Sequence, residues 1–239
     1  MAQRGLLYRV GQDRYVVAPI EASALSQAAP PELLIDLALG SHPYYIGFLS
    51  ALIAHRLTDL HSEIAYAAVP AEVRPRGRTP IALKIARLSP RAWPAPDEIE
   101  RFRVLEGTKE FAHRSAVERA LVDGLLRPDL CAGFETVVLA WGRAGRRADV
   151  SWDRVAQAAR GIGDATARRA AFMLGLLSLE TIVERHFADL EGRAANTPLD
   201  RSNGFNLDRS EIERDPRTGI LLNVPRRHLR GWVEAGADA

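Results

Sequence analysis

From Ser115 to Leu190 the sequence is a series of segments in which apolar residues recur every three or four positions, with glycine or proline between them. Such spacing forms one apolar helix face, so this half of the chain is predicted to be α-helical. The first helix is expected to start at Ser115, whose spacing to Glu118 suits a capping box, and to end before Pro128. The other expected helices are 134–143, 152–160 capped by Ser151, 165–177 capped by Asp164, and 180–190.

The first half of the sequence favours strands, because its apolar runs are short, rich in β-branched or aromatic residues, and bounded by turn-forming residues. Three hairpins are expected there, with one more strand near the C-terminus. The expected strand pairs are 6–10 with 14–17 around Gly11-Gln12-Asp13, 63–69 with 81–88, and 102–105 with 109–113 around Glu106-Gly107-Thr108; the last strand is 220–224.

Two helices are expected between the first two hairpins. One covers 33–39 and stops at Gly40, and the other is capped by Ser41 and carries apolar residues at helical spacing from Tyr45 to Leu57. The predicted fold class is therefore α+β: an N-terminal β-hairpin, then a mixed α/β domain with a helix-rich second half. An Ala-, Ser- and Pro-rich stretch at 21–32 reads as a linker, and 226–239 as a basic tail.

Composition indicates a folded intracellular protein. With 239 residues, 47% of them hydrophobic, the chain can bury a substantial core. Its best apolar run, 44–54, is closed by His55 and Arg56, which is too short for a membrane span. Charges at Arg4 and Arg9 interrupt any signal-peptide pattern. The single cysteine, Cys131, cannot form an internal disulfide, so a reducing, cytoplasmic location is expected.

Motifs for catalysis are absent, so we expect no enzyme, cofactor or metal. Of six histidines only His55 and His61 are near each other, and their spacing does not place two ligands on one helix face. No phosphate-binding loop or G-x-S-x-G elbow occurs, and Cys131 is expected to be buried and inert. A metal-dependent nuclease remains an alternative; its candidate residues are Glu106, Lys109, Glu110, Glu118 and Asp123.

Arginine is the distinctive residue type, since all but two of the 32 basic residues are arginines. The skew fits a GC-rich genome, yet guanidinium groups also suit bidentate contacts with phosphate. If several clusters converge on one face, they would bind nucleic acid through its backbone; each cluster alone is more often a solvated surface. The clusters are 74–78, 143–147, 168–169 and 226–230.

The order of several blocks is specific to one family. LYRVGQDRYVVAP, YYIGFLSALIAHRLTD, RSAVERALVDGLLRPDLCAGFETVVLAWGRA, VSWDRVAQAARGIGDATARRAAFMLGLL and LLNVP resemble successive blocks of the AbiEi antitoxins of type IV toxin–antitoxin (abortive infection) systems. The resemblance runs from about Gly5 to Pro225. It implies a winged-helix DNA-binding unit that represses its own operon and a C-terminal domain that neutralises a nucleotidyltransferase-like toxin, without catalytic residues and without a stable complex being required.

On this resemblance, residues 1–20 form a wing-like hairpin and 30–225 one antitoxin domain. The wing makes Arg9, Gln12 and Arg14 the candidate contacts to the DNA backbone, and the next basic cluster adds Arg74, Arg76 and Arg78. The family's helix-turn-helix precedes the wing, whereas only MAQRG precedes Leu6 here. We expect either an upstream start or a member that has lost operator binding.

The leading hypothesis is thus an antitoxin and transcriptional regulator involved in phage defence. Its expected partners are operator DNA and, functionally, the cognate toxin, with no membrane partner. A stand-alone DNA-binding repressor is the first alternative and the nuclease the second. The neighbouring gene and the codons upstream of Met1 would discriminate the first two.

Overall fold

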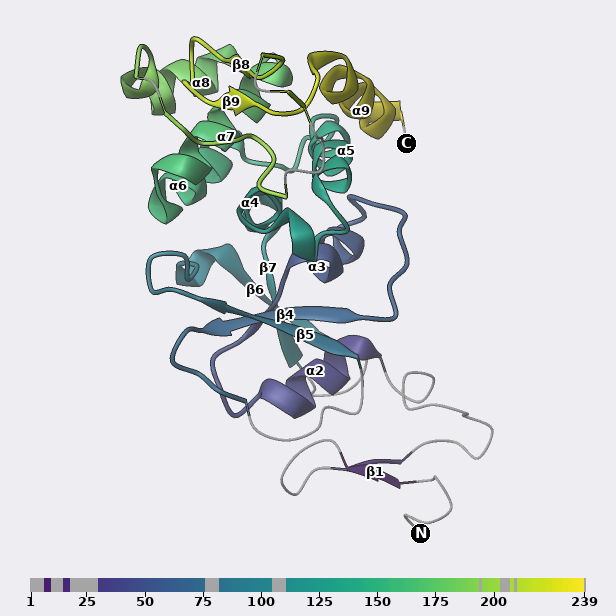
Figure 1. The fold of residues 1–239 in the computed structure, drawn as a ribbon. Coiled ribbons are helices and arrows are strands. Elements are labelled where there is room, and N and C mark those ends of the chain that lie inside the picture. Colours follow the sequence, from purple (N-terminus) through teal and green to yellow (C-terminus); the bar gives the residue numbers. More distant parts are fainter. Residues whose placement is uncertain are drawn as a thin grey trace. The chain divides into compact units, whose positions relative to one another are not determined.

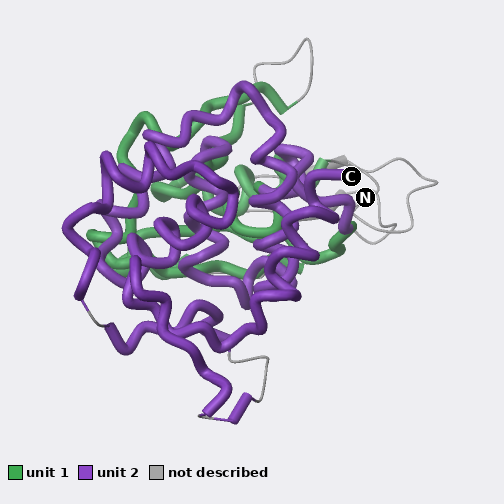
Figure 2. Tube along the Cα trace, turned by 90° about the horizontal axis from the view of Figure 1, so that it is seen from above, with its two compact units in different colours: residues 1–51, 61–115 green, residues 52–60, 116–239 purple. Residues whose placement is uncertain are grey.

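We analysed a computed structural model of the chain. The residues it describes are 7–9, 15–17, 30–75, 82–104, 111–193, 195–202, 207–208 and 210–238. They belong to two compact units, coloured separately in Figure 2: unit 1 comprises Met1–Ala51 and His61–Ser115, and unit 2 comprises Leu52–Leu60 and Ala116–Ala239. The range 30–225, expected to be one domain, contains residues of both compact units.

The elements confirm an α+β fold. The α-helices are α2 (Pro31–Leu39), α3 (Phe48–Ala54), α4 (Val117–Leu126), α5 (Phe134–Ala144), α6 (Trp152–Ile162), α7 (Asp164–Leu176), α8 (Glu180–Phe187) and α9 (Arg226–Asp238). The strands are β1 (Leu7–Arg9), β2 (Tyr15–Val17), β3 (Tyr45–Ile46), β4 (Ala65–Pro70), β5 (Leu83–Leu88), β6 (Ile99–Arg103), β7 (Phe111–Ser115), β8 (Glu213–Arg214) and β9 (Leu221–Leu222).

A five-stranded mixed sheet with the order β5-β4-β3-β7-β6 organises unit 1. Helix α2 lies along this sheet in Figure 1, and its Ile35 and Leu39 join a buried cluster with Ile46 of β3 and Ala112 of β7. The helix begins with Pro31. Proline is favoured in the first turn because the amide N–H that it lacks would have no acceptor within the helix. The helix ends at Gly40 as expected. Pro31 and Glu32, the last two residues of the expected linker, thus belong to α2, while residues 21–29 lie outside the described ranges.

The long helix expected from Ser41 to Leu57 is wrong. Tyr45 and Ile46 form β3 at the centre of the sheet, antiparallel to β4 and parallel to β7, and α3 starts only at Phe48. Both β3 side chains are buried, as are Phe48, Leu49 and Leu52. Polar positions normally reveal whether a sequence has the two-residue period of a strand or the 3.6-residue period of a helix. A stretch that is apolar throughout lacks them, so the two cannot be distinguished there.

Strands β4 and β5 exist where expected, but they pair in parallel, from Ala65 with Leu83 to Pro70 with Leu88. The predicted hairpin is therefore wrong. The connection, residues 71–82, is long enough for the chain to cross back and start a parallel strand, which takes about a dozen residues. Strands β6 and β7 do pair antiparallel, as expected, with Arg103 opposite Phe111. Strands β1 and β2 are also antiparallel, while their connecting turn lies outside the described residues.

Helices α4–α8 of unit 2 lie close to the predicted segments, although their caps differ. Ser151 does cap α6, accepting from the Arg154 amide at 3.5 Å. The capping box at Ser115 is wrong: Ala116 occupies the cap position, and Glu118 instead accepts from the Ser151 amide at 3.1 Å. Asp164 does not cap α7 either, because it is already the first helical residue.

The C-terminal residues form helix α9 instead of the expected basic tail. Leu229 and Gly236 are buried on it, and Figure 1 shows α9 alongside α5. Buried positions at this spacing lie on one helix face, while the arginines that suggested a tail, Arg226, Arg227 and Arg230, are exposed. In the described ranges, no helix has both the length and the apolar composition to cross a bilayer.

Candidate nucleic-acid interface

Most of the predicted DNA contacts lie outside the residues whose side chains the structure describes. Gln12, Arg14, Arg76 and Arg78 have no described side chains, and of Arg9 only the strand backbone is described. Arg74 is exposed and forms no ion pair within the part of the chain that the structure describes. The wing therefore stays a prediction, and the candidate interface has to be built from the other arginines.

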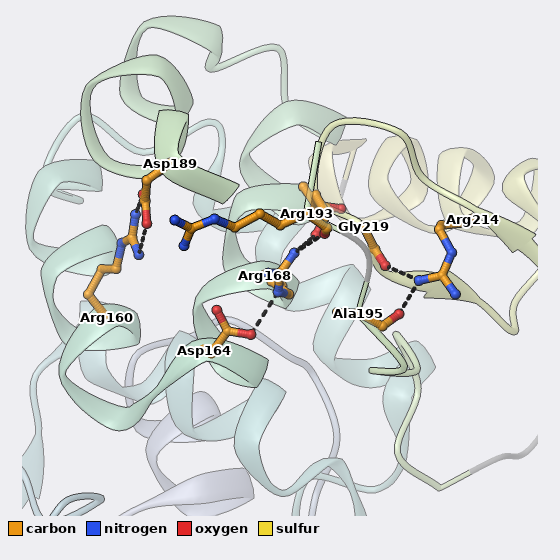
Figure 3. A network of polar contacts seen from close by, with 9 residues as sticks. Arg160, Asp164, Arg168, Asp189, Arg193, Ala195, Arg214 and Gly219 are labelled. Atoms are coloured by element: carbon orange, nitrogen blue, oxygen red, sulfur yellow. Dashed lines mark hydrogen bonds and ion pairs between the residues drawn. The ribbon is translucent and has the colours of Figure 1, made fainter. Parts of the chain in front are cut away.

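Arg168 of α7 is an internal clamp and not a surface cation. Its guanidinium is buried, with Nε donating to Asp164 at 2.7 Å and Nη1 donating to the carbonyls of Arg193 at 2.9 Å and Thr218 at 2.5 Å (Figure 3). Gly219 has φ of 69°, and a Cβ there would meet both the Arg193 carbonyl and Arg168. Arg168 thus joins two distant stretches of irregular chain to α7.

Other arginines hold the same C-terminal segment by its backbone. Arg169 donates from Nε to the carbonyls of Pro198 and Leu199. Arg214 donates to those of Ala195 and Gly219 (Figure 3). Such hydrogen bonds satisfy buried carbonyls that no regular structure serves. The 168–169 cluster predicted as a possible nucleic-acid surface is therefore wrong as a surface, since both side chains are buried in unit 2.

Further arginines of unit 2 are neutralised by carboxylates, all but one of those paired below being aspartates. The pairs are Arg127–Asp129, Arg143–Asp59, Arg147–Asp149, Arg160–Asp189, Arg185–Asp153 and Arg226–Glu213. The arginine charges hold the pKa of Asp129, Asp149, Asp153 and Asp189 below the usual range, mainly through hydrogen bonds to the carboxylates; for Asp153 the His186 bond is the larger contribution. These arginines support the fold of the unit.

Two of the predicted clusters lie toward the same end of the α5–α9 pair. The α5 backbone at Leu139 meets Gly236, and Gly142 meets Val233, so the residue numbers run in opposite directions and the helices are antiparallel. At a rise of about 1.5 Å per residue, the chain beyond Gly142 and the first turns of α9 lie at the same level. Segments 143–147 and 226–230 therefore lie toward the same end of the α5–α9 pair.

Four arginines at that end are exposed and form no ion pair within the described ranges: Arg56, Arg146, Arg227 and Arg230. Arg56 belongs to the group because the carbonyl of the preceding His55 accepts from Arg147 at 2.6 Å. No acidic residue lies in the first turn of α9, where the helix dipole is positive and repels cations. We call these four residues the arginine quartet; its uncompensated charge suits a polyanion such as a nucleic-acid backbone.

The sequence missed Arg56, and no local pattern could have revealed it, because it is an isolated arginine next to an expected helix. It also could not show which clusters converge. Unit 1 has a separate cationic feature at β6, where Arg101 and Arg103 lie 4.0 and 5.5 Å from the centre of the Phe111 ring. These contacts orient the two guanidinium groups. Because Arg101 packs on one face of the Phe111 ring, a nucleic-acid base could not stack on that face.

The nuclease residues do not assemble among the described residues. Asp123 is fully buried and accepts a hydrogen bond from Arg119 at 2.8 Å. Glu118 accepts from the Ser151 amide. Glu106, Lys109 and Glu110 lie outside the described ranges. No group of three or more His, Cys, Asp or Glu side chains suited to a metal occurs in the part described. Cys131 is buried as expected, and burial raises the pKa of its thiol.

Comparison with known proteins shows a likeness of fold to solved structures. No protein-family model and no curated protein matches the chain. The chain is similar to the crystal structure of the RV2827C protein from Mycobacterium tuberculosis, with a TM-score of 0.65 and 14% identity over 90% of this chain and 75% of that one. At this identity the likeness concerns the fold alone.

Proposed function

We propose that this chain is the antitoxin and transcriptional regulator of a type IV toxin–antitoxin system, and that it counteracts a nucleotidyltransferase-like toxin without catalysing a reaction. The resemblance of its sequence blocks to AbiEi antitoxins supports the antitoxin role. The single observation that carries the regulatory part is the arginine quartet, Arg56, Arg146, Arg227 and Arg230, whose side chains are exposed and form no ion pair with a described carboxylate.

Contacts from the quartet would position DNA without reading its sequence. Arginine contacts to phosphate carry affinity and its salt dependence, whereas sequence is read by groups that reach base edges. In this proposal the quartet adds backbone contacts to those of the wing residues Arg9, Gln12 and Arg14.

The DNA part is tested by measuring the affinity for duplex DNA from upstream of the gene over a range of salt concentrations. Replacing Arg227 and Arg230 together with alanine removes two backbone contacts. The slope of log K against log salt should then fall by about 2, and affinity should fall similarly for unrelated duplexes. A double Arg87→Ala/Arg91→Ala variant is the matched control, because both residues are exposed cations of unit 1. Equal slopes in the two double variants would contradict a role for the quartet.

The antitoxin part is tested by co-expression with the nucleotidyltransferase-type gene expected next to this one. Growth arrest by the toxin should be relieved by the unmodified chain. Failure of this rescue together with intact DNA binding would favour the stand-alone repressor, and failure of both would reject the proposed function.

A further inference from the structure

Strands β6 and β7 bring two arginines to one aromatic ring. The strands are antiparallel, with Arg103 opposite Phe111 and Arg101 opposite His113. Residues that face each other across paired strands lie on the same side of the sheet, and so do residues two apart on one strand. Arg101, Arg103 and Phe111 therefore share one face of the β6–β7 pair.

The other face of this strand pair is used by the fold of unit 1. Phe102 and Ala112, which are cross-strand partners, join the buried cluster that includes residues of α2. On the same face Arg114 lies over the Phe102 ring at 4.8 Å, and its Nε donates to Glu100 at 3.0 Å. The arginine on that face is thus neutralised by a carboxylate.

The Phe111 ring orients Arg101 without neutralising it. The guanidinium carbon of Arg101 lies 4.0 Å from the ring centre, and that of Arg103 lies 5.5 Å from it. Carbon atoms in van der Waals contact are about 3.5–4.0 Å apart, so the Arg101 group lies against the ring face. A guanidinium group in this position keeps its N–H donors, because they point outward in its own plane.

Both arginines are exposed, whereas Phe111 is half-buried beneath them. Neither arginine forms an ion pair with a described carboxylate. Because one planar face of Arg101 contacts the ring, its exposed area lies on the outer face and on the N–H edges. The β6–β7 pair therefore presents a flat cation of fixed orientation, with a second cation over the same ring.

A flat cation beside a second cation fits a nucleotide whose base is unpaired. Guanidinium planes are among the groups on which unstacked bases stack, and a neighbouring guanidinium can form paired hydrogen bonds with a phosphate. A duplex offers its phosphates, but its bases are already stacked on one another. Carboxylates of an acidic protein offer charge without a flat ring. Single-stranded nucleic acid is thus the partner that uses both features.

We propose that Arg101 and Arg103 form a binding site for single-stranded nucleic acid on the outer face of β6–β7. An unpaired base stacks on the outer face of Arg101, and a phosphate of the same strand binds Arg103. Phe111 is a positioning residue that holds Arg101. The site goes beyond the proposed function, since it takes single strands and belongs to unit 1, whereas the arginine quartet belongs to unit 2.

The test measures the affinity of the full chain for a fluorescently labelled oligothymidylate over a range of salt concentrations. Arg101→Ala should weaken binding by about tenfold, an effect typical of losing one base-stacking side chain. Arg101→Lys keeps the charge but lacks the plane, so it should lose nearly as much affinity while the slope of log K against log salt stays unchanged. Arg87→Ala is the matched control and should leave the affinity unchanged, because Arg87 is an exposed arginine on β5 of the same sheet.

Phe111→Leu tests the positioning role. Both charges remain in this variant, so the salt slope should be unchanged. The affinity should fall by about threefold to tenfold, because binding must then order an arginine that the ring no longer holds. Phe111→Tyr, which restores a ring, should restore the affinity. A Phe111→Leu variant that is less stable to heat but binds as tightly as the unmodified chain would overturn this role.

Two further ligands identify the kind of partner. The duplex of the oligothymidylate with its complementary strand should bind Arg101→Lys as well as it binds the unmodified chain, and polyglutamate should not displace the single strand. The proposal fails if Arg101→Lys binds the single strand normally, if it loses duplex binding to the same extent, or if polyglutamate competes equally. The losses should persist in the Arg227→Ala/Arg230→Ala background, which separates this site from the quartet.

Discussion

Gly142 of α5 lies directly against Val233 of α9: a Cβ on Gly142 would be 2.3 Å from the Val233 carbonyl oxygen. The same relationship recurs one turn along, where a Cβ on Gly236 would be 2.1 Å from the Leu139 carbonyl oxygen. The two helix backbones are thus in contact at both points. This contact holds α9, with Arg227 and Arg230, beside the end of α5.

Replacing Gly142 or Gly236 with alanine should therefore separate the helices. Each variant should lose about 1–3 kcal/mol of unfolding free energy, the usual cost of overpacking, measured by urea denaturation. Gly231→Ala is the matched control. Gly231 is on the same helix as Gly236, and no atom lies within 4 Å of the position that its Cβ would take. That change should stabilise the chain by about 0.5–1 kcal/mol, so destabilisation by all three variants would argue against the close contact.

The buried pair Arg119–Asp123 should be structural. Both side chains are at most 2% exposed and 2.8 Å apart within α4. Asp123→Ala leaves a buried arginine charge uncompensated and should cost about 3–5 kcal/mol, whereas the double variant Arg119→Met/Asp123→Leu should cost much less. Denaturant unfolding measures both. The double variant also gives a folded protein for the nuclease alternative, which would regain support if metal-dependent cleavage were present in the native chain and absent from that variant.

Cys131 should be unreactive in the folded protein. It is fully buried, and burial followed by the charge of Asp123 raises the pKa of its thiol, so the thiolate that reacts is scarce. Labelling by a thiol reagent at mildly alkaline pH should be slow in buffer and rapid in denaturant. Rapid stoichiometric labelling of the native chain would show that the site around Cys131 opens.

Acid should weaken unit 2 through its arginine-bound aspartates. The hydrogen bonds from His186 and Arg185 lower the pKa of Asp153, so the folded state holds the charged form more strongly than the unfolded state does. Stability from such a group is present above the unfolded pKa and is lost as pH falls through the folded pKa. Asp153→Asn should thus reduce the fall in the urea midpoint between about pH 5 and about pH 3. Glu72→Gln, at an exposed acid of unit 1, should leave that fall unchanged.

The sequence predicted elements well wherever one side of the chain is polar. Helices α5 and α6 match the expected segments within two residues at each end, because their exposed faces make the period visible. Strand β3 was missed because it is buried on both faces. The parallel pairing of β4 and β5 was missed because turn-forming residues between two strands do not determine whether the strands run parallel or antiparallel.

The candidate site was predictable only as a set of clusters. Adjacent arginines such as Arg168 and Arg169 look like a charged surface, yet the carbonyls that Arg168 binds lie 25 and 50 residues further along the chain. Likewise, the segments 143–147 and 226–230 lie toward one end of a helix pair because glycines let α5 and α9 approach. Long-range partners decide whether an arginine supports the fold or faces solvent, and one sequence does not contain them.

The clamp formed by Arg168 gives the last prediction. Arg168→Met should leave the Arg193 and Thr218 carbonyls without their donor and cost about 2–4 kcal/mol, since buried unsatisfied groups carry the full desolvation penalty. The segment from Arg193 to Gly219 should then open locally, so limited trypsin digestion should cut faster after Arg193, Arg214 or Arg217. Arg185→Met, which removes an exposed arginine paired with Asp153, should not change that rate. Unchanged cleavage in Arg168→Met would mean that the segment is held by its β8–β9 pairing and by Arg169 and Arg214 alone.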